Sequence, residues 1–178
     1  MKLTKYNPKN TSEIEQLFIK TFSDSEGQSE GHLIGRLVRD FIDNTDPKDL
    51  YCFVAIEDKQ IIGSIFFSRM TFEENISAFI LAPVAIHTDY QKKGIGQKLI
   101  NFGLQTLKAD GVKLALTYGD PNFYSKVGFH VVTEELVPAP LTLKYPEGWL
   151  AQSLIGNEIM PIAGKSYCVE AINKPEYW

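Results

Sequence analysis

Residues 81–96 read LAPVAIHTDYQKKGIG and join an apolar, β-rich run to an amphipathic helical pattern. The run Ala78–Ile86 predicts a strand. Pro83 within it cannot donate a ladder hydrogen bond, so we expect a bulge or a local splay there. Gly94–Asp110 then predicts a helix, which Gly111 is placed to end in the left-handed conformation. A strand, a glycine-containing loop and a helix therefore follow one another directly.

The elements before this unit are helices and then a hairpin. Ser12 and Glu15 are spaced as a capping box, which predicts a helix running to about Phe22. The polar stretch 23–31 reads as a loop, and apolar residues at helical spacing predict a second helix that ends near Asn44. Two β-rich runs, 51–56 and 61–67, flank a polar turn and predict a hairpin.

The elements after the unit are short. We expect strands at Leu114–Tyr118, Phe129–Thr133 and Val169–Ile172, with a turn or a single helical turn at Pro121–Lys126. Helices, antiparallel hairpins and a strand–helix–strand unit in this order predict a mixed α+β fold.

Composition narrows the class of protein. A chain of 178 residues with 44% hydrophobic residues is long enough to bury one sizeable core, so we expect a single domain over residues 1–178. The net charge of -4 gives no general attraction to nucleic acid or to an anionic membrane. Cys52 and Cys168 lack metal or redox spacing, so no metal is expected. No signal core or spanning run is visible, which predicts a cytoplasmic protein.

The loop Gln91–Gly96 has the features of an anion site. Backbone N–H groups converge at a helix N-terminus, glycines allow a phosphate to approach closely, and Lys92 and Lys93 add positive charge. A dinucleotide fingerprint would need glycine in place of Leu99, and a P-loop would need Gly-Lys-Ser/Thr, so neither alternative fits. The structural alternative is a tight turn with a solvated lysine pair.

Two motifs together resemble the GNAT acetyltransferase superfamily. The first is the strand Leu81–Ile86 followed by Gln91-x-x-Gly94-x-Gly96, and the second is the stretch Gly119–Phe129, which looks like the family's Tyr-x-x-x-Gly-Phe element. The resemblance is strongest over a core motif region, residues 76–133. It implies the GNAT acyl-CoA N-acyltransferase fold, with a mixed, mostly antiparallel central sheet and flanking helices.

The resemblance also implies acetyl-CoA as the acyl-donor cosubstrate. In the family, the strand before the loop offers backbone groups to the pantetheine arm, the loop holds the pyrophosphate, and the later turn lies beside the cofactor. The cofactor-binding positions carried over are Val84, Ala85, Ile86, Gln91, Lys92, Lys93, Gly94, Ile95, Gly96, Asn122 and Lys126.

The implied reaction is acetyl transfer to a primary amine by direct attack in a ternary complex. Tyr124 is the expected general acid for the departing thiolate. With a tyrosine pKa of about 10 and a thiol pKa of about 8.5, full proton transfer is uphill by roughly 2 kcal/mol. An amine also needs a base, and the sequence does not choose among the candidates. These are Glu26, Glu30, Asp40, Glu73, Glu74 and Asp120, with His87 more consistent with a cap at the strand end.

Two other classes of function stay open. A noncatalytic acyl-CoA-binding regulatory module would keep Gly94 and Gly96 but would not need an acid at Tyr124. A plain structural or interaction protein would not bind CoA at all. The acceptor is not identified by the sequence, and the oligomeric state is open, with a homodimer among the candidates.

Overall fold

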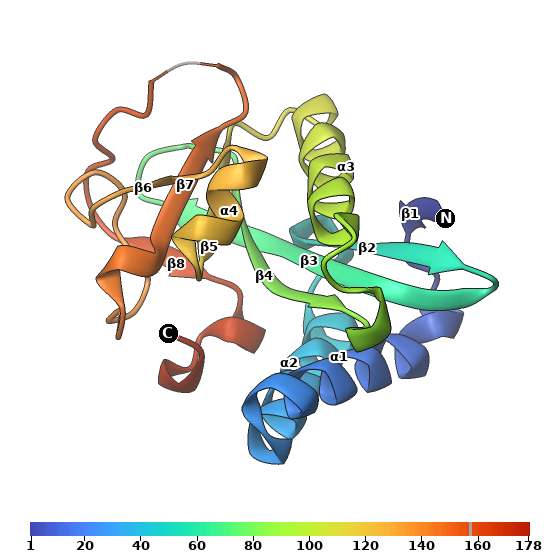
Figure 1. Cartoon of the computed structure of the whole chain (residues 1–178). Helices are drawn as coiled ribbons and strands as arrows, with labels where there is room; N and C mark the ends of the chain where they lie inside the picture. Colours follow the sequence, from blue (N-terminus) through green and yellow to red (C-terminus); the bar gives the residue numbers. More distant parts are fainter. Residues whose placement is uncertain (157) are drawn as a thin grey trace. The chain divides into compact units, whose positions relative to one another are not determined.

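The computed structural model describes residues 1–156 and 158–178 and has a mixed α/β fold (Figure 1). The helices are α1 (Thr11–Glu26), α2 (Gln28–Asn44), α3 (Ile95–Ala109) and α4 (Pro121–Tyr124). The strands are β1 (Lys2–Lys5), β2 (Leu50–Glu57), β3 (Gln60–Phe72), β4 (Ala78–Ile86), β5 (Leu114–Tyr118), β6 (His130–Val131), β7 (Trp149–Ser153) and β8 (Ser166–Cys168).

The chain forms two compact units. Unit 1 comprises Met1–Phe67 and Pro83–Gly103, and unit 2 comprises Ser68–Ala82 and Leu104–Trp178. Strands β3 and β4 and helix α3 contribute residues to both units. The single domain expected over residues 1–178 stays a prediction.

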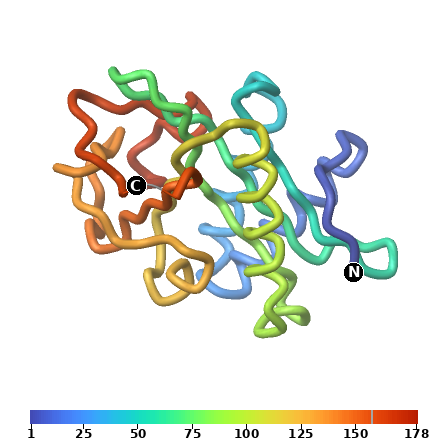
Figure 2. Tube along the Cα trace, turned by 90° about the horizontal axis from the view of Figure 1, so that it is seen from above, coloured from blue at the N-terminus to red at the C-terminus, as the bar shows by residue number. Residues whose placement is uncertain are grey.

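The sheet of unit 1 begins with β1, which pairs antiparallel with β2 from Lys2↔Ile56 to Lys5↔Phe53. Figure 2 shows this N-terminal strand, in dark blue, beside the hairpin of β2 and β3. The predicted hairpin is confirmed. Its turn places Asp58 and Lys59 at φ of 48° and 66°, and two consecutive positive φ values match the twist of the flanking strands.

The loop expected over residues 23–31 is wrong, because helix occupies most of it. Helix α1 continues to Glu26, Gly27 at φ 98° breaks the helical path, and α2 starts at Gln28. A Cβ on Gly31 would lie 2.5 Å from the Ile19 carbonyl, so this glycine allows α1 and α2 to approach closely. The glycine in this stretch is therefore explained by the close packing of two helices and not by a loop.

The capping box expected at Ser12 and Glu15 is also wrong. Helix α1 starts at Thr11, and its N-cap residue is Asn10, two residues before Ser12, with no side-chain cap bond. Glu15 instead forms an ion pair with Arg39 of α2 at 2.6 Å. The carboxylate is therefore used to join the two helices.

Both faces of the unit 1 sheet are covered by helices (Figure 1). On one face the Phe66 ring lies 5.7 Å from Phe18 of α1 and 5.6 Å from Phe41 of α2. On the other face, a Cβ on Gly103 of α3 would lie 2.6 Å from the Phe67 ring, so this glycine permits close helix–sheet contact. Adjacent strand residues point to opposite faces, which explains why nearly all of β3 is buried.

Unit 2 contains a parallel pair among antiparallel ones. The first half of β4 pairs parallel with β5, from Ala78↔Leu114 to Leu81↔Thr117. Strand β7 pairs antiparallel with both β5 and β6, and β8 pairs antiparallel with the end of β3. These pairings confirm the predicted fold class, a mixed and mostly antiparallel sheet with flanking helices.

Two features of unit 2 differ from the sequence prediction. The expected strand at Val169–Ile172 is wrong: strand β8 lies just before it, and Glu170–Ile172 form a 3-10 turn that buries Ala171 and Ile172. Strand β7 was not predicted. It begins at the fully buried Trp149, whose indole N–H donates to the Val137 carbonyl at 2.8 Å.

Candidate active site

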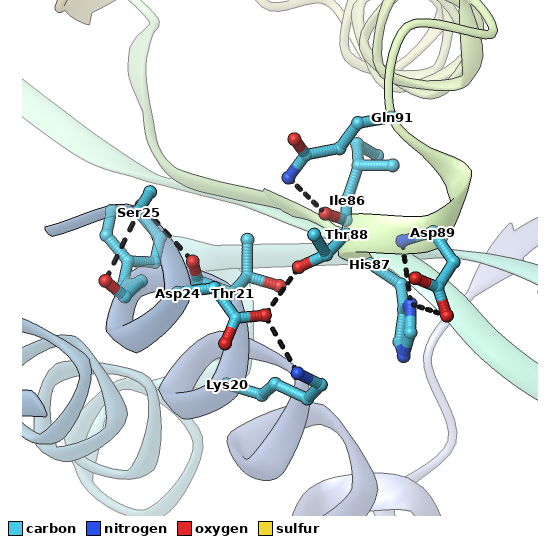
Figure 3. A network of polar contacts seen from close by, with 10 residues as sticks. Lys20, Thr21, Asp24, Ser25, Ile86, His87, Thr88, Asp89 and Gln91 are labelled. Carbon is cyan, nitrogen blue, oxygen red and sulfur yellow. Dashed lines mark hydrogen bonds and ion pairs between the residues drawn. The ribbon is translucent and has the colours of Figure 1, made fainter. Parts of the chain in front are cut away.

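The loop after β4 is folded back onto the end of its strand. The register of β4 with β5 ends at Leu81, before Pro83, while β4 itself continues to Ile86. The Gln91 side-chain amide then donates to the Ile86 carbonyl at 3.0 Å. This bond fixes where the loop starts, and Figure 3 shows it at the strand end. The expected bulge or splay at Pro83 stays a prediction.

The loop has the backbone geometry of an anion site. Lys92 and Gly94 both have positive φ, at 60° and 74°, and α3 begins at the next residue. The Lys98 N–H donates to the Gly94 carbonyl at 3.1 Å and so closes the first turn. N–H groups at the start of a helix have no acceptor within the helix, so they are available to an anion. A Cβ on Gly94 would meet nothing within 4 Å.

The two loop lysines differ in their contacts. Lys93 donates to the Asp89 carbonyl at 2.9 Å, and its ammonium lies 5.0 Å from the centre of the Tyr90 ring. Lys92 is exposed on the turn. Positive charge therefore lies beside the N-terminus of α3, where it adds to the helix dipole.

A polar network joins α1 to the turn before the loop (Figure 3). An oxygen of Asp24 accepts from the Lys20 ammonium at 2.8 Å and from the Thr88 hydroxyl at 2.7 Å. The hydrogen bonds from Lys20 and Thr88 lower the pKa of Asp24. His87 caps the same turn, since its Nδ1 accepts from the Asp89 N–H at 3.3 Å. His87 therefore lies just after the strand, as expected, but its side chain caps the 3-10 turn Thr88–Tyr90 and not the strand end.

Tyr124 is held at the end of α4 in unit 2. The Asp120 side chain caps this short helix by accepting from the Asn122 N–H at 2.9 Å. The Tyr124 ring meets Phe123 and Phe129 edge-on, with ring centres 5.0 Å and 6.0 Å away. A Cβ on Gly119 would lie 2.7 Å from the Tyr124 ring, so glycine is required for the ring to lie there. Asn122 and Lys126 are exposed on this turn.

The acidity of Tyr124 differs from the value assumed from the sequence. Burial is the largest cause that raises its pKa to about 12; a hydrogen bond with Thr117 acts in the opposite direction, and the negative charge of Asp120 raises the pKa further. Against a thiol pKa of about 8.5, full proton transfer is now uphill by roughly 5 kcal/mol. The phenol is therefore a weaker acid than the sequence suggested.

The candidate bases have different surroundings. Three already accept hydrogen bonds: Asp120 from Asn122, Asp40 from the Asn44 amide at 2.7 Å, and Glu74 from the Ala163 N–H at 2.7 Å. Glu26 ends α1, and its pKa is raised by burial and by the negative charge of Glu30. A raised pKa makes a carboxylate a better base, so the acidity of Glu26 suits this role, and its side chain is exposed at the end of α1.

The predicted residues fall into two groups. Residues 84–86 and 91–96 follow one another along the end of β4, the loop and the start of α3 in unit 1, and residues 122, 124 and 126 lie on one turn of unit 2. Sequence reasoning missed Thr117, Asp24 and Thr88. No motif marks them, because each acts through a contact that is distant in sequence.

The described residues hold neither a cluster of metal ligands nor a helix that could span a membrane. Among the described residues, no group of three His, Cys, Asp or Glu side chains is placed to hold a metal ion. No helix in the same residues is both long enough and apolar enough to cross a membrane.

The fold, a mixed and mostly antiparallel sheet with a glycine loop between β4 and α3, matches that of solved GNAT acetyltransferase structures. Residues 48–131 match the family model described as "Acetyltransferase (GNAT) domain". The chain is 25% identical over 167 residues to the uncharacterized N-acetyltransferase YjhQ of Escherichia coli K12, covering 90% of this chain and 88% of that protein. It is 34% identical over 80 residues to the uncharacterized N-acetyltransferase YhbS of the same strain, covering 44% and 48%. The chain is therefore similar to GNAT acetyltransferases over residues 48–131 and to an N-acetyltransferase over most of its length.

Solved structures show the same fold. The structure of YhbS from Escherichia coli in complex with CoA has a TM-score of 0.83 and 23% identity, covering 98% of this chain and 92% of that one. A GNAT family acetyltransferase from Brucella melitensis in complex with acetyl-CoA has a TM-score of 0.74 and 24% identity, covering 97% of both chains.

Proposed function

We propose that the protein transfers an acetyl group from acetyl-CoA to a primary amine, by direct attack of the amine on the thioester. The observation that carries this proposal is the loop from Lys92 to Gly94, whose two positive φ values lead into the N-terminus of α3. The proteins of similar fold that were solved with CoA and with acetyl-CoA support the choice of donor.

Each part of the donor has a proposed partner. The pyrophosphate accepts hydrogen bonds from the N–H groups of the loop and of the first turn of α3, with Gln91–Gly96 as the binding segment. The backbone of Val84, Ala85 and Ile86 bonds the pantetheine arm. The N–H near Val84 faces the thioester oxygen and stabilises the negative charge that forms on it during attack. Asn122 and Lys126 contact the cofactor from the turn of α4.

Two proton movements complete the proposed reaction. Tyr124 donates a hydrogen bond, and finally its proton, to the sulfur that leaves. An alkyl amine with a pKa of about 10.4 must lose a proton before it attacks, at a cost of about 4.6 kcal/mol at pH 7. Glu26, whose pKa is raised, is the proposed base, acting directly or through a water molecule.

The test uses purified protein, acetyl-CoA and a panel of primary amines. Release of free thiol is followed with a chromogenic disulfide, and acetylated amine is identified by mass spectrometry. We expect thiol release that depends on the amine and matches the acetylated product in amount. Thiol release that no amine on a broad panel raises above the rate without protein would contradict the proposal.

One observation favours a second function. The pKa of about 12 at Tyr124 makes it a weak acid, as a noncatalytic acyl-CoA-binding regulatory module on the same fold would tolerate. Calorimetry separates the two functions: tight acetyl-CoA binding with no turnover on any amine would favour the regulatory module. The cytoplasmic location and a homodimer stay predictions.

A further inference from the structure

The last turn of α1 is hydrogen-bonded to the short turn that precedes the proposed phosphate loop. The Asp24 carboxylate accepts from the Thr88 hydroxyl at 2.7 Å, although the two residues are 64 positions apart in the chain. The same oxygen accepts from the Lys20 ammonium at 2.8 Å, and this partner orients the carboxylate from one turn earlier in α1. Figure 3 shows these contacts joining α1 to the segment that follows β4, and all three residues belong to unit 1.

The turn that begins at Thr88 is bonded directly to the loop. The Gln91 N–H donates to the Thr88 carbonyl at 3.3 Å, and the Lys93 ammonium donates to the Asp89 carbonyl at 2.9 Å. The Gln91 side chain is also tied back to the strand by its bond to the Ile86 carbonyl at 3.0 Å. A shift of Thr88 would therefore move the residues from which the loop starts.

The loop needs such support because its backbone conformation is unfavourable in isolation. Lys92 has a φ of 60°, and the left-handed conformation is costly for a residue that carries a Cβ. Such a conformation persists where the surrounding structure fixes it. The exposed pair of Lys20 and Asp24 adds little to stability, since water and salt weaken surface ion pairs. The bond from Asp24 to Thr88 is therefore better explained by the position it gives to the loop than by the stability it gives to the fold.

We propose that Asp24 is a positioning residue for the loop: by holding Thr88, it keeps the N–H groups of residues 91–96 in the arrangement that receives the pyrophosphate. This inference rests on the proposed function. Preformed N–H groups bind an anion more tightly, because the loop loses less conformational freedom when the anion arrives. Asp24 acts through Thr88 and has no part in the chemical step. Its loss should therefore weaken donor binding and leave kcat at saturating acetyl-CoA nearly unchanged.

Substitutions at both ends of the bond test the proposal. Asp24→Ala removes the acceptor, Thr88→Val removes the hydroxyl and keeps the size of the side chain, and Thr88→Ser keeps the hydroxyl. Asp24→Ala and Thr88→Val should each raise the Kd for CoA about threefold to tenfold, as expected for the loss of one hydrogen bond. Thr88→Ser should bind CoA as the unaltered protein does. Isothermal titration calorimetry gives the Kd values, and steady-state kinetics gives kcat.

A double variant and a control separate positioning from general damage to α1. Once Asp24→Ala has removed the bond, adding Thr88→Val should raise the Kd no further. Glu15→Ala breaks a different ion pair of α1, the one with Arg39 of α2, and should leave the Kd for CoA unchanged. The inference is wrong if Asp24→Ala binds CoA normally, if the two single effects add, or if Glu15→Ala raises the Kd equally. It is also wrong if Thr88→Ser loses as much affinity as Thr88→Val.

A readout in the free protein separates this inference from the proposed function. NMR relaxation of ¹⁵N-labelled protein gives backbone order parameters for residues 92–96 without any ligand. In Asp24→Ala and Thr88→Val these should fall from the rigid range of about 0.85 towards the flexible range below about 0.6, and in Glu15→Ala they should not. Unchanged order parameters in the first two variants would overturn the inference. A fall in those variants, when even the unaltered protein binds no CoA, would retain the positioning role of Asp24 and refute the proposed function alone.

Discussion

The proposed phosphate site can be tested by substituting Gly94, with Gly111 at the opposite end of helix α3 as the control. Gly94 precedes α3 at φ 74°, and Gly111 follows it at φ 84°. A Cβ at either position would meet nothing within 4 Å, so alanine meets no steric obstacle in the protein at either end. Alanine in the left-handed region costs about 1–2 kcal/mol, so Gly94→Ala and Gly111→Ala should lower the free energy of unfolding by similar amounts.

The two variants should differ in CoA affinity. At Gly94 the added methyl group enters the space proposed for the pyrophosphate and displaces one charge-assisted hydrogen bond, worth about 1.5–3 kcal/mol. That loss corresponds to a Kd about tenfold to a hundredfold higher. Gly111→Ala should bind CoA as the unaltered protein does. Isothermal titration calorimetry gives both Kd values, and denaturant unfolding gives both stabilities. If the two variants lose the same stability and bind CoA equally well, the loop does not hold the pyrophosphate.

Three further changes test other parts of the molecule. Tyr124→Phe should lower kcat about a hundredfold, which is the lower end of the effect of general acid catalysis. Calorimetry should show that the Kd for acetyl-CoA changes by no more than a factor of about two. If the variant keeps full turnover, Tyr124 is not the general acid. Because the folded pKa of Tyr124 lies above the unfolded value of about 10, its contribution to stability is present below pH 10 and is lost as pH rises towards 12. Denaturant unfolding should therefore show a smaller loss in Tyr124→Phe over that range, and equal losses would contradict the pKa shift. Gly35→Val should lower the free energy of unfolding by about 1–3 kcal/mol, because the valine side chain would overlap Ile19 of α1. If denaturant unfolding is unchanged, α1 and α2 are not in tight contact at this position.

The strand–loop–helix unit could be predicted because its signals are local. The apolar run of β4 and the glycine that follows it determine the backbone conformation only within a few residues. The observed bounds of β4 and α3 therefore agree with the predicted ones to within about one residue. The end of α3 was equally predictable, since Gly111 adopts the left-handed conformation that its position requires.

The features that sequence reasoning missed depend on distant partners. Residues 23–31 look like a loop by composition, yet Gly31 is needed for contact with Ile19 on another helix. The stretch Val169–Ile172 buries Ala171 and Ile172, but it does so in a 3-10 turn and not in a strand, because burial alone does not fix the backbone conformation. Thr117 is one polar residue inside an apolar strand, and its hydroxyl bonds the carbonyl of Leu81, 36 residues earlier in the chain.

The pKa of Tyr124 changes which part of the chemistry the protein has to assist. From the sequence, the amine needed about 4.6 kcal/mol to lose its proton, and the acid needed only about 2 kcal/mol to supply one. With a phenol pKa of about 12, the free-energy cost of transferring the phenol proton becomes nearly equal to the cost of deprotonating the amine. Burial keeps the phenol neutral and therefore available as a donor at any pH near neutrality, but it also makes the phenolate unfavourable. A phenol in that position is useful only if something stabilises the phenolate at the moment it forms. Of the influences on this phenol, the hydrogen bond with Thr117 acts in that direction, because it lowers the pKa of Tyr124.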